Sequence, residues 1–228
     1  MSGWMAGLVA TAVVGAAAVG EPVREGRART PATEDAGAIK TISKFCDGLV
    51  AMTKITNRRR LFGLVEKSQS DRGRWTEYNQ QAELDAAAKA GHVYDVAQVW
   101  SRQDGAIAVS MSLSSGSGDW IQYVEYCFRP DGTLARTHAT LNTFNAVSKD
   151  EFKDVSGASR QRDRYFDGSG RQVKVTKQLL DLKTKLPDPT LQFMESDEPI
   201  YKTATALPFF DLLKRGSPNT PLQTSPRR

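Results

Sequence analysis

The feature that most constrains the fold is a series of β-strand patterns, separated by glycine turns, between residues 92 and 182. Asp104-Gly105, Asp131-Gly132 and Gly168–Gly170 each lie between two such patterns. Glycine in a short turn between two strand patterns is typical of a β-hairpin, because tight turns need a positive φ. We predict three consecutive hairpins, with a type I′ turn at Asp131-Gly132 in the stretch YCFRPDGTLAR. Together they predict an antiparallel β-meander of about six strands in a curved sheet.

The strand pattern after the first turn alternates strictly between large apolar side chains and small or polar ones. The large apolar positions are Ile107, Val109, Met111 and Leu113. A period of two places these four side chains on one side of the strand, so another element has to cover that side.

A long amphipathic pattern precedes the hairpins. Apolar residues recur at steps of three and four between residues 36 and 55, which predicts a helix with one buried face. No other long amphipathic element is available in the sequence, so we predict that Ile42, Phe45 and Leu49 cover the apolar side of residues 107–113. The predicted fold class is therefore α+β, with this N-terminal helix packed on one face of the sheet.

Three other segments complete the secondary structure expected from the sequence. Residues 80–91 favour a short helix that ends at Gly91. The run Leu61–Val65 fits a strand or a continued helix, because a short apolar run does not distinguish the two. The apolar residues between 207 and 213 fit either a helix or an extended strap packed on the sheet.

The domain organisation follows from composition along the chain. Residues 6–19 carry no charge, and about 14 apolar residues are too few to cross a bilayer but match the apolar region of a signal peptide. We therefore predict a signal peptide over 1–20 and no membrane span after processing, although the segment before residue 6 lacks Lys and Arg. The alternative is an alanine-rich N-terminal helix. A flexible linker over 21–35, a single α+β domain over 36–215 and a disordered tail over 216–228 follow.

The chain contains two cysteines, Cys46 and Cys127. If the protein is exported, they can form one disulfide that joins the predicted helix to the sheet. If it stays in the cytosol, they are expected to be buried free thiols. The sequence leaves both alternatives open.

The net charge of +5 does not indicate a nucleic-acid partner. Lys and Arg are scattered, apart from the short run Arg58–Arg60 and the pair Arg227-Arg228. A nucleic-acid surface would gather basic residues on one face with aromatic residues among them. We expect a solvated basic surface instead.

No residue set has the spacing of a known catalytic or metal site. His92 and His138 are the two histidines, too few and too far from the cysteines for a typical zinc site. We therefore predict no metal, no cofactor and no catalytic residue. The weak catalytic alternatives are Ser110 or Ser112 with His138 and an Asp, without a nucleophile-elbow motif, and Glu125 paired with Asp119 or Glu77.

Aromatic residues cluster in the β-rich half of the chain and suggest a binding role. If some of them line the concave face of a curved sheet, they could hold an apolar ligand or a peptide, and otherwise they pack in the core. The ligand-binding candidates are Trp100, Trp120, Tyr123 and Tyr126. The expected function is that of an exported, bacterial-type, non-enzymatic domain of the cell envelope that binds a small apolar ligand or a protein. The alternative is a small secreted hydrolase.

Overall fold

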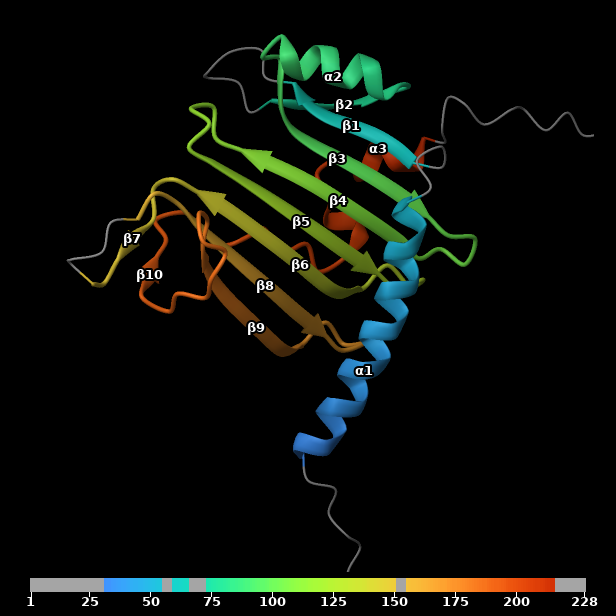
Figure 1. Ribbon diagram of the computed structural model, residues 1–228. Coiled ribbons are helices and arrows are strands. Elements are labelled where there is room, and N and C mark those ends of the chain that lie inside the picture. The colour runs from blue at the N-terminus through green and yellow to red at the C-terminus, as the bar shows by residue number, and fades with distance from the viewer. Residues whose placement is uncertain (1–30, 55–58, 66–72, 151–154, 216–228) are drawn as a thin grey trace, which may run out of the picture.

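The computed structural model describes residues 31–54, 59–65, 73–150 and 155–215, with side chains from residue 36 onward. The fold is α+β, as predicted, and its centre is an antiparallel sheet of eight strands in the order β2-β1-β3-β4-β5-β6-β8-β9 (Figure 1). Helices pack on one face of this sheet, and residues 191–215, here called the C-terminal strap, cross the other face (Figure 1). The predicted signal peptide, residues 21–30 of the predicted linker and the predicted tail lie outside the described residues.

The elements follow one another in a simple order along the chain. The α-helices are α1 (Pro31–Val50), α2 (Gln81–Lys89) and α3 (Phe210–Lys214), and the 3-10 helices are η1 (Ala51–Lys54) and η3 (Ala204–Ala206). The strands of the large sheet are β1 (Arg59–Val65), β2 (Arg74–Tyr78), β3 (Val93–Ser101), β4 (Ile107–Ser114), β5 (Trp120–Phe128), β6 (Leu134–Thr143), β8 (Ala158–Phe166) and β9 (Gln172–Asp181). A separate small pair consists of β7 (Val147–Ser148) and β10 (Leu191–Gln192).

The prediction of about six strands was too low, because the large sheet contains eight. The two additional strands are β1, whose pattern was ambiguous between strand and helix, and β2, which pairs with it. In the structure β1 lies between β2 and β3, so both of its edges are hydrogen-bonded. Both faces of β1 are also covered, because Phe62 lies in the core under the strap and Leu61 lies in the cluster under α2, which explains why its short apolar run shows no alternation that would identify it as a strand.

The three predicted hairpin turns are confirmed, but the predicted turn type at Asp131-Gly132 was wrong. Arg129 N donates to Thr133 O and Gly132 N donates to Arg129 O, and φ is positive at Gly132 but not at Asp131. A type I′ turn would need positive φ at both central residues, whereas this pattern is a three-residue loop that ends in a left-handed glycine. The Asp131 side chain accepts a hydrogen bond from Thr133 N, which stabilises the loop.

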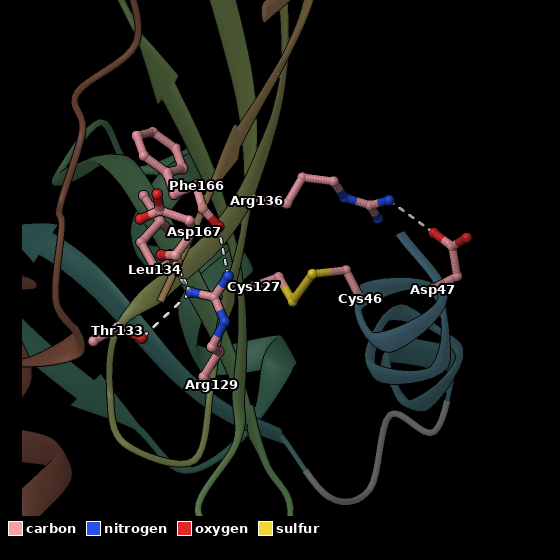
Figure 2. The surroundings of a disulfide bond; sticks show 9 residues. All are labelled: Cys46, Asp47, Cys127, Arg129, Thr133, Leu134, Arg136, Phe166 and Asp167. Carbon is pink, nitrogen blue, oxygen red and sulfur yellow. Dashed lines mark hydrogen bonds and ion pairs between the residues drawn. A yellow bond between two sulfur atoms is a disulfide. The ribbon is translucent and has the colours of Figure 1, made fainter. Parts of the chain in front are cut away.

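Arg129, in the same stretch, connects two of the hairpins. Its guanidinium donates to the backbone oxygens of Leu134 and Phe166, at 2.7 and 2.5 Å (Figure 2). Burial lowers the pKa of Arg129, the direction expected when a cation is partly removed from water. The stretch YCFRPDGTLAR is therefore a structural junction between the β5–β6 and β8–β9 turns.

The face of the sheet that the strap covers, here called the strap face, contains the main hydrophobic core. Its strand residues include Phe62, Val109, Met111, Tyr126 and Phe128, all almost fully buried. The strap contributes Ala204, Leu207 and Phe209 to the same cluster, and the Phe209 ring stacks on Phe62 at 4.9 Å between centroids. The Tyr126 hydroxyl donates to Pro199 O at 2.8 Å, so its polar end is also satisfied by the strap.

The opposite face, here called the helix face, packs against α1 and α2. Helix α1 buries Ile42, Cys46 and Leu49 against Trp100, Ala108 and neighbouring small residues. The predicted contact between α1 and the side chains of Ile107, Val109, Met111 and Leu113 was therefore wrong. Those side chains lie on the strap face, and α1 packs on the small-residue side of β4 instead. Small side chains such as Ala108 allow a helix to approach the sheet closely, which large apolar ones would prevent.

Helix α1 begins at Pro31 rather than at residue 36, so the predicted linker is helical over 31–35. Proline favours the first position of a helix, where its missing N–H has no partner to lose. None of the helices in the described ranges is long and apolar enough to cross a membrane.

A disulfide between Cys46 and Cys127 joins α1 to β5 (Figure 2). The Cα atoms of the two cysteines are 5.7 Å apart, within the ordinary range for a disulfide. Next to it, Arg136 on β6 donates to Asp47 on α1 at 2.8 Å. The helix is therefore attached to its face by a covalent bond, a small apolar cluster and one ion pair.

Candidate functional site

Between α1 and α2 the helix face carries a continuous row of polar side chains. Each of six neighbouring strands contributes one residue, and each residue lies directly opposite the next in the strand register. The members of this row, here called the polar row, are Gln98, Ser110, Glu125, His138, Asp163 and Thr176. All six are half-buried. Directly opposite side chains on one face of a sheet are about 5 Å apart at their Cβ atoms, so adjacent members can interact.

Two neighbouring members of the row, His138 and Asp163, are in direct polar contact. His138 Nδ1–H donates to Asp163 Oδ1 at 2.9 Å, and Thr176 Oγ1–H donates to Asp163 Oδ2 at 3.1 Å. The hydrogen bond to Asp163 raises the pKa of His138 despite partial burial, and the Glu125 charge acts in the same direction. The hydrogen bond from His138 lowers the pKa of Asp163. The row therefore holds an oriented imidazole that favours its protonated form.

A small cavity adjoins the polar row at Ser110 and Glu125, beside the C-terminal end of α1 and η1. Its volume is about 90 Å³, and Val50, Thr53, Trp100, Ser110 and Glu125 are among its lining residues. The lining combines an aromatic wall with hydroxyl and carboxylate groups. Such a space admits a few water molecules or a small polar group rather than a whole ligand.

The geometry of the row limits the catalytic chemistry available to it. His138 and Asp163 have the arrangement of a general base and the group that orients it. Ser110, however, lies two strands away from His138, and two strand spacings amount to roughly 9.6 Å. A serine at that separation is outside hydrogen-bond reach of the imidazole, so the row does not place a nucleophile beside its base.

The other catalytic pairings considered from the sequence are not brought together. Ser112 lies opposite Tyr123 and so belongs to the next row of the same face. Asp119 is in the turn before β5, where it accepts a hydrogen bond from Ser117. Glu77 pairs with Arg60 at 2.7 Å and lies opposite Phe62, a residue of the strap face. Neither carboxylate is therefore a partner of Glu125.

The four aromatic ligand-binding candidates are divided between the two faces. Trp100 is buried under α1 on the helix face, and Tyr123 lies on the same face with 47% of its surface exposed. Tyr126 is buried on the strap face, and Trp120, half-buried, lies opposite Thr143 on that same side of the sheet. They do not line one shared site, and among them only Tyr123 offers an exposed ring to a ligand.

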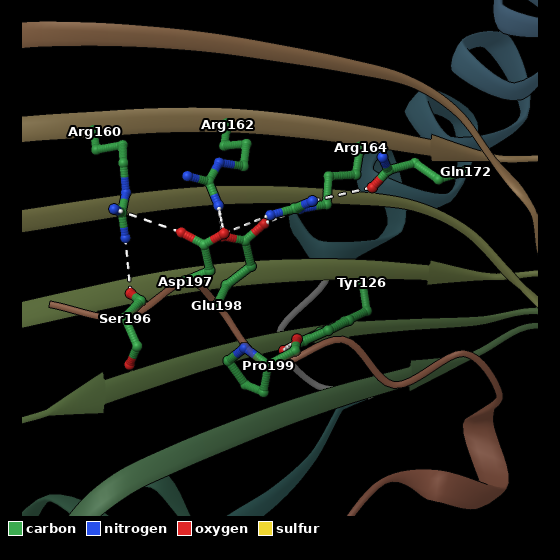
Figure 3. A network of polar contacts seen from close by, with 9 residues as sticks. All are labelled: Tyr126, Arg160, Arg162, Arg164, Gln172, Ser196, Asp197, Glu198 and Pro199. Atoms are coloured by element: carbon green, nitrogen blue, oxygen red, sulfur yellow. Dashed lines mark hydrogen bonds and ion pairs between the residues drawn. The ribbon is translucent and has the colours of Figure 1, made fainter.

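A second polar cluster on the strap face anchors the strap. Arg160, Arg162 and Arg164 alternate along β8 and point toward Asp197 and Glu198 (Figure 3). Glu198 Oε1 accepts from Arg164 Nε at 2.7 Å and Oε2 from Arg162 Nη1 at 3.2 Å. The Glu198 side chain is only 1% exposed. A buried carboxylate shared by two arginines is costly to expose and has its charge neutralised internally, so we interpret this cluster as an anchor rather than a site.

The polar row was not detectable from local sequence signals. His138 and Asp163 are 25 residues apart, and only the β6–β8 register makes them neighbours. Within the residues that the structure describes, no three His, Cys, Asp or Glu side chains gather as metal ligands. Comparison of the chain with protein-family models, with curated proteins and with solved structures found no match.

Proposed function

We propose that the protein is a non-enzymatic binding domain of the cell envelope that uses the open part of its helix face. The observation that carries this proposal is the part of the helix face between α1 and α2 that no described element covers, here called the open strip (Figure 1). The polar row and the exposed Tyr123 lie on this face. One face of an antiparallel sheet is commonly solvated, so polarity alone would not suffice. The additional argument for binding is that the oriented His138–Asp163 pair lies on the same face as the exposed ring of Tyr123.

The chemistry of this strip favours a protein or a polar ligand. Its side chains are amides, hydroxyls, carboxylates and one imidazole, which recognise a partner through hydrogen bonds. A small apolar ligand would need an apolar cavity. The centre of the strap face is filled by Leu207 and Phe209 of the strap, and the cavity of about 360 Å³ beside Trp75 and Leu212 is also lined by the charged Arg74 and Glu77. We therefore propose a protein or polar partner in preference to a small apolar one.

The proposed location outside the cytoplasm is supported by the disulfide. Disulfides persist in oxidising compartments and are rare in the cytosol. The apolar segment over 6–19 supports export independently. Mass spectrometry of the protein purified from its host tests both points. The expected result is a chain that lacks the first 18–20 residues and does not react with thiol reagents unless it is first reduced and unfolded.

The binding surface is tested by site-specific photo-crosslinking in the producing cell. A photoreactive phenylalanine replaces Tyr123 on the open strip or, as a control, Phe144, which is 68% exposed in the loop after β6. We expect a discrete cross-linked product from position 123 that is lost when Glu125→Arg is added, and none from position 144. Identical product patterns from both positions would contradict the proposal.

A secreted hydrolase remains the second candidate because of the contact between His138 and Asp163. In that case the imidazole would act as a general base toward a water molecule, without a protein nucleophile. The purified protein would be tested on ester, glycoside and peptide substrates beside the His138→Gln variant. Turnover by the wild type that disappears in His138→Gln would favour the hydrolase, and equal background rates would favour the binding domain.

A further inference from the structure

The last strand of the sheet leaves a hydrogen-bonding edge open. Strand β9 pairs with β8 on one side only. Leu182 N donates toward β8, to Gly157 O, whereas Asp181 N donates to Leu186 O on the other side. Backbone groups alternate in direction along an antiparallel strand, so those of Val175 and Lys177 also point away from β8.

The chain itself already adds a short strand to one end of this edge. Asp181 N donates to Leu186 O, and Asp188 N donates to Leu179 O, which is an antiparallel bridge around Leu180 and Pro187. The bridge does not continue: Asp188 turns the chain by accepting from Thr190 N, and Pro189 has no N–H to donate. Among the described residues, nothing pairs with the outward backbone groups of Val175 and Lys177.

We propose that this edge is a second interaction surface, which binds an extended acidic segment of a partner protein as an additional antiparallel strand. The proposal goes beyond the binding role assigned to the helix face and does not depend on it. Addition of a strand to an open sheet edge supplies affinity through main-chain hydrogen bonds and selectivity through alternate side chains. Here Val175 and Lys177 offer two N–H and two C=O groups to the incoming strand.

The side chains of β9 define the chemistry of the partner. Lys174 and Lys177 are exposed, and no described acidic side chain forms an ion pair with either. Lys174 lies opposite Tyr165 on the helix face, and Lys177 lies opposite Arg162 on the strap face. Val175, between them, is 42% exposed on the strap face.

This spacing predicts a pattern in the partner strand. Read from its N-terminus, an antiparallel partner meets Lys177 first, then Thr176, Val175 and Lys174. Opposite charges and β-branched pairs are favourable at directly opposite positions, so the predicted motif is acidic, any residue, β-branched, acidic. A second copy of β9 would bring its own two lysines to the same seam, so like charges disfavour a homodimer through this edge. Lysines also protect edges from aggregation, and a purely protective role predicts no binding of the acidic motif.

The proposal is tested with the full chain and the blocked peptide TTETVETT, with TTKTVKTT as the charge-reversed control. The acidic peptide is expected to bind, and the amide protons of Val175 and Lys177 are expected to exchange more slowly by NMR when it does. The lysine peptide is expected not to bind. Absence of binding by the acidic peptide, or protection at other amides only, would overturn the proposal.

Two sets of variants distinguish strand addition from attraction by net charge. Val175→Pro removes an outward N–H without a ladder bond to β8 and should abolish binding, whereas Val175→Thr keeps the N–H and should preserve it. Lys174→Glu/Lys177→Glu should weaken binding about tenfold or more, and Lys149→Glu/Lys202→Glu, with the same change of net charge at exposed sites, should not. Equal losses in both double variants, or unchanged binding by a folded Val175→Pro protein, would refute the site. Cross-linking from position 123 reports the helix face separately.

Discussion

The two faces of the sheet are closed in different ways. The strap face is covered along its length by residues 191–215, which supply aromatic rings to the core and two acidic side chains to the arginines of β8. Among the described residues, the helix face is covered only at its margins, by α1 and α2, and α1 is held by one disulfide and a small apolar cluster. The comparison predicts that the strap face supplies most of the stability, because the strap adds both apolar and ionic contacts to it.

The largest effect should come from removing the anchor of the strap. Glu198→Ala leaves Arg162 and Arg164 without the buried carboxylate that they share, which should lower the free energy of unfolding by about 3–5 kcal/mol. Urea denaturation measures the change. The matched control on the helix face is Asp47→Ala, whose side chain is 66% exposed and whose loss should cost less than about 1 kcal/mol. Similar losses in the two variants would abolish the distinction between the faces.

The second effect concerns the covalent attachment of α1. The double variant Cys46→Ala/Cys127→Ala should lower the free energy of unfolding by about 2–4 kcal/mol, because the bond closes a long loop. Hydrogen exchange should then show faster exchange in α1 first, with β3–β6 still protected. Faster exchange throughout the sheet would mean that the helix face contributes as much to the core as the strap face does.

The third effect is a pH dependence confined to the helix face. Because the folded-state pKa of His138 is raised, its contribution to stability is fully present below its unfolded pKa of about 6.5 and is lost as pH rises through the folded pKa. The pKa of Asp163 is lowered, so its contribution is lost as pH falls through the folded value, below about 3.9. Partial exposure limits the effect to about 1 kcal/mol.

The measurement is the difference in free energy of unfolding between the wild type and His138→Gln. This difference should be largest between about pH 4 and pH 6.5 and smaller at pH 8.5. His92→Gln, in the exposed turn after α2, is the control for the substitution itself. A difference in free energy of unfolding that stays constant between about pH 4 and pH 8.5 would show that protonation of His138 does not stabilise the fold.

The smallest effect should be that of the exposed tyrosine. Tyr123→Ala is expected to change the free energy of unfolding by no more than about 0.5 kcal/mol, because the ring lies on the open strip. Three residues along the same strand, Tyr126→Ala should cost about 3–5 kcal/mol, because that ring is buried on the strap face and donates to the strap. Comparable losses would mean that the open strip is covered in solution.

Local sequence patterns predicted the hairpins but not what covers them. The turns at Gly105, Gly132 and Gly170 were predictable, because a positive φ is a local requirement. The alternation in β4 showed which side of the strand had to be buried, and the helix predicted over 36–55 was assigned to that side. The real cover, the strap, has apolar residues such as Leu207 and Phe209 without helical or strand periodicity. The sequence therefore predicted that residues 207–213 pack on the sheet, but not on which face.

The candidate site was beyond local reasoning for a different reason. Glu125, His138 and Asp163 are each ordinary polar residues on the solvated side of a strand. Their meeting depends on the register of β5, β6 and β8, which a one-residue slip would destroy. Side-chain chemistry identified Glu125 and His138 as candidates, but only the strand pairing shows that they lie in one row.

The position of the strap in the chain has a consequence for biosynthesis. Every strand of the large sheet precedes residue 191, so the apolar side that carries Val109, Met111 and Phe128 has no cover until the last part of the chain is available to fold. An exposed apolar face of this kind binds chaperones and aggregates. A chain whose strap has not yet folded should therefore be held by a chaperone, and its release should coincide with the arrival of Glu198 at the arginines of β8.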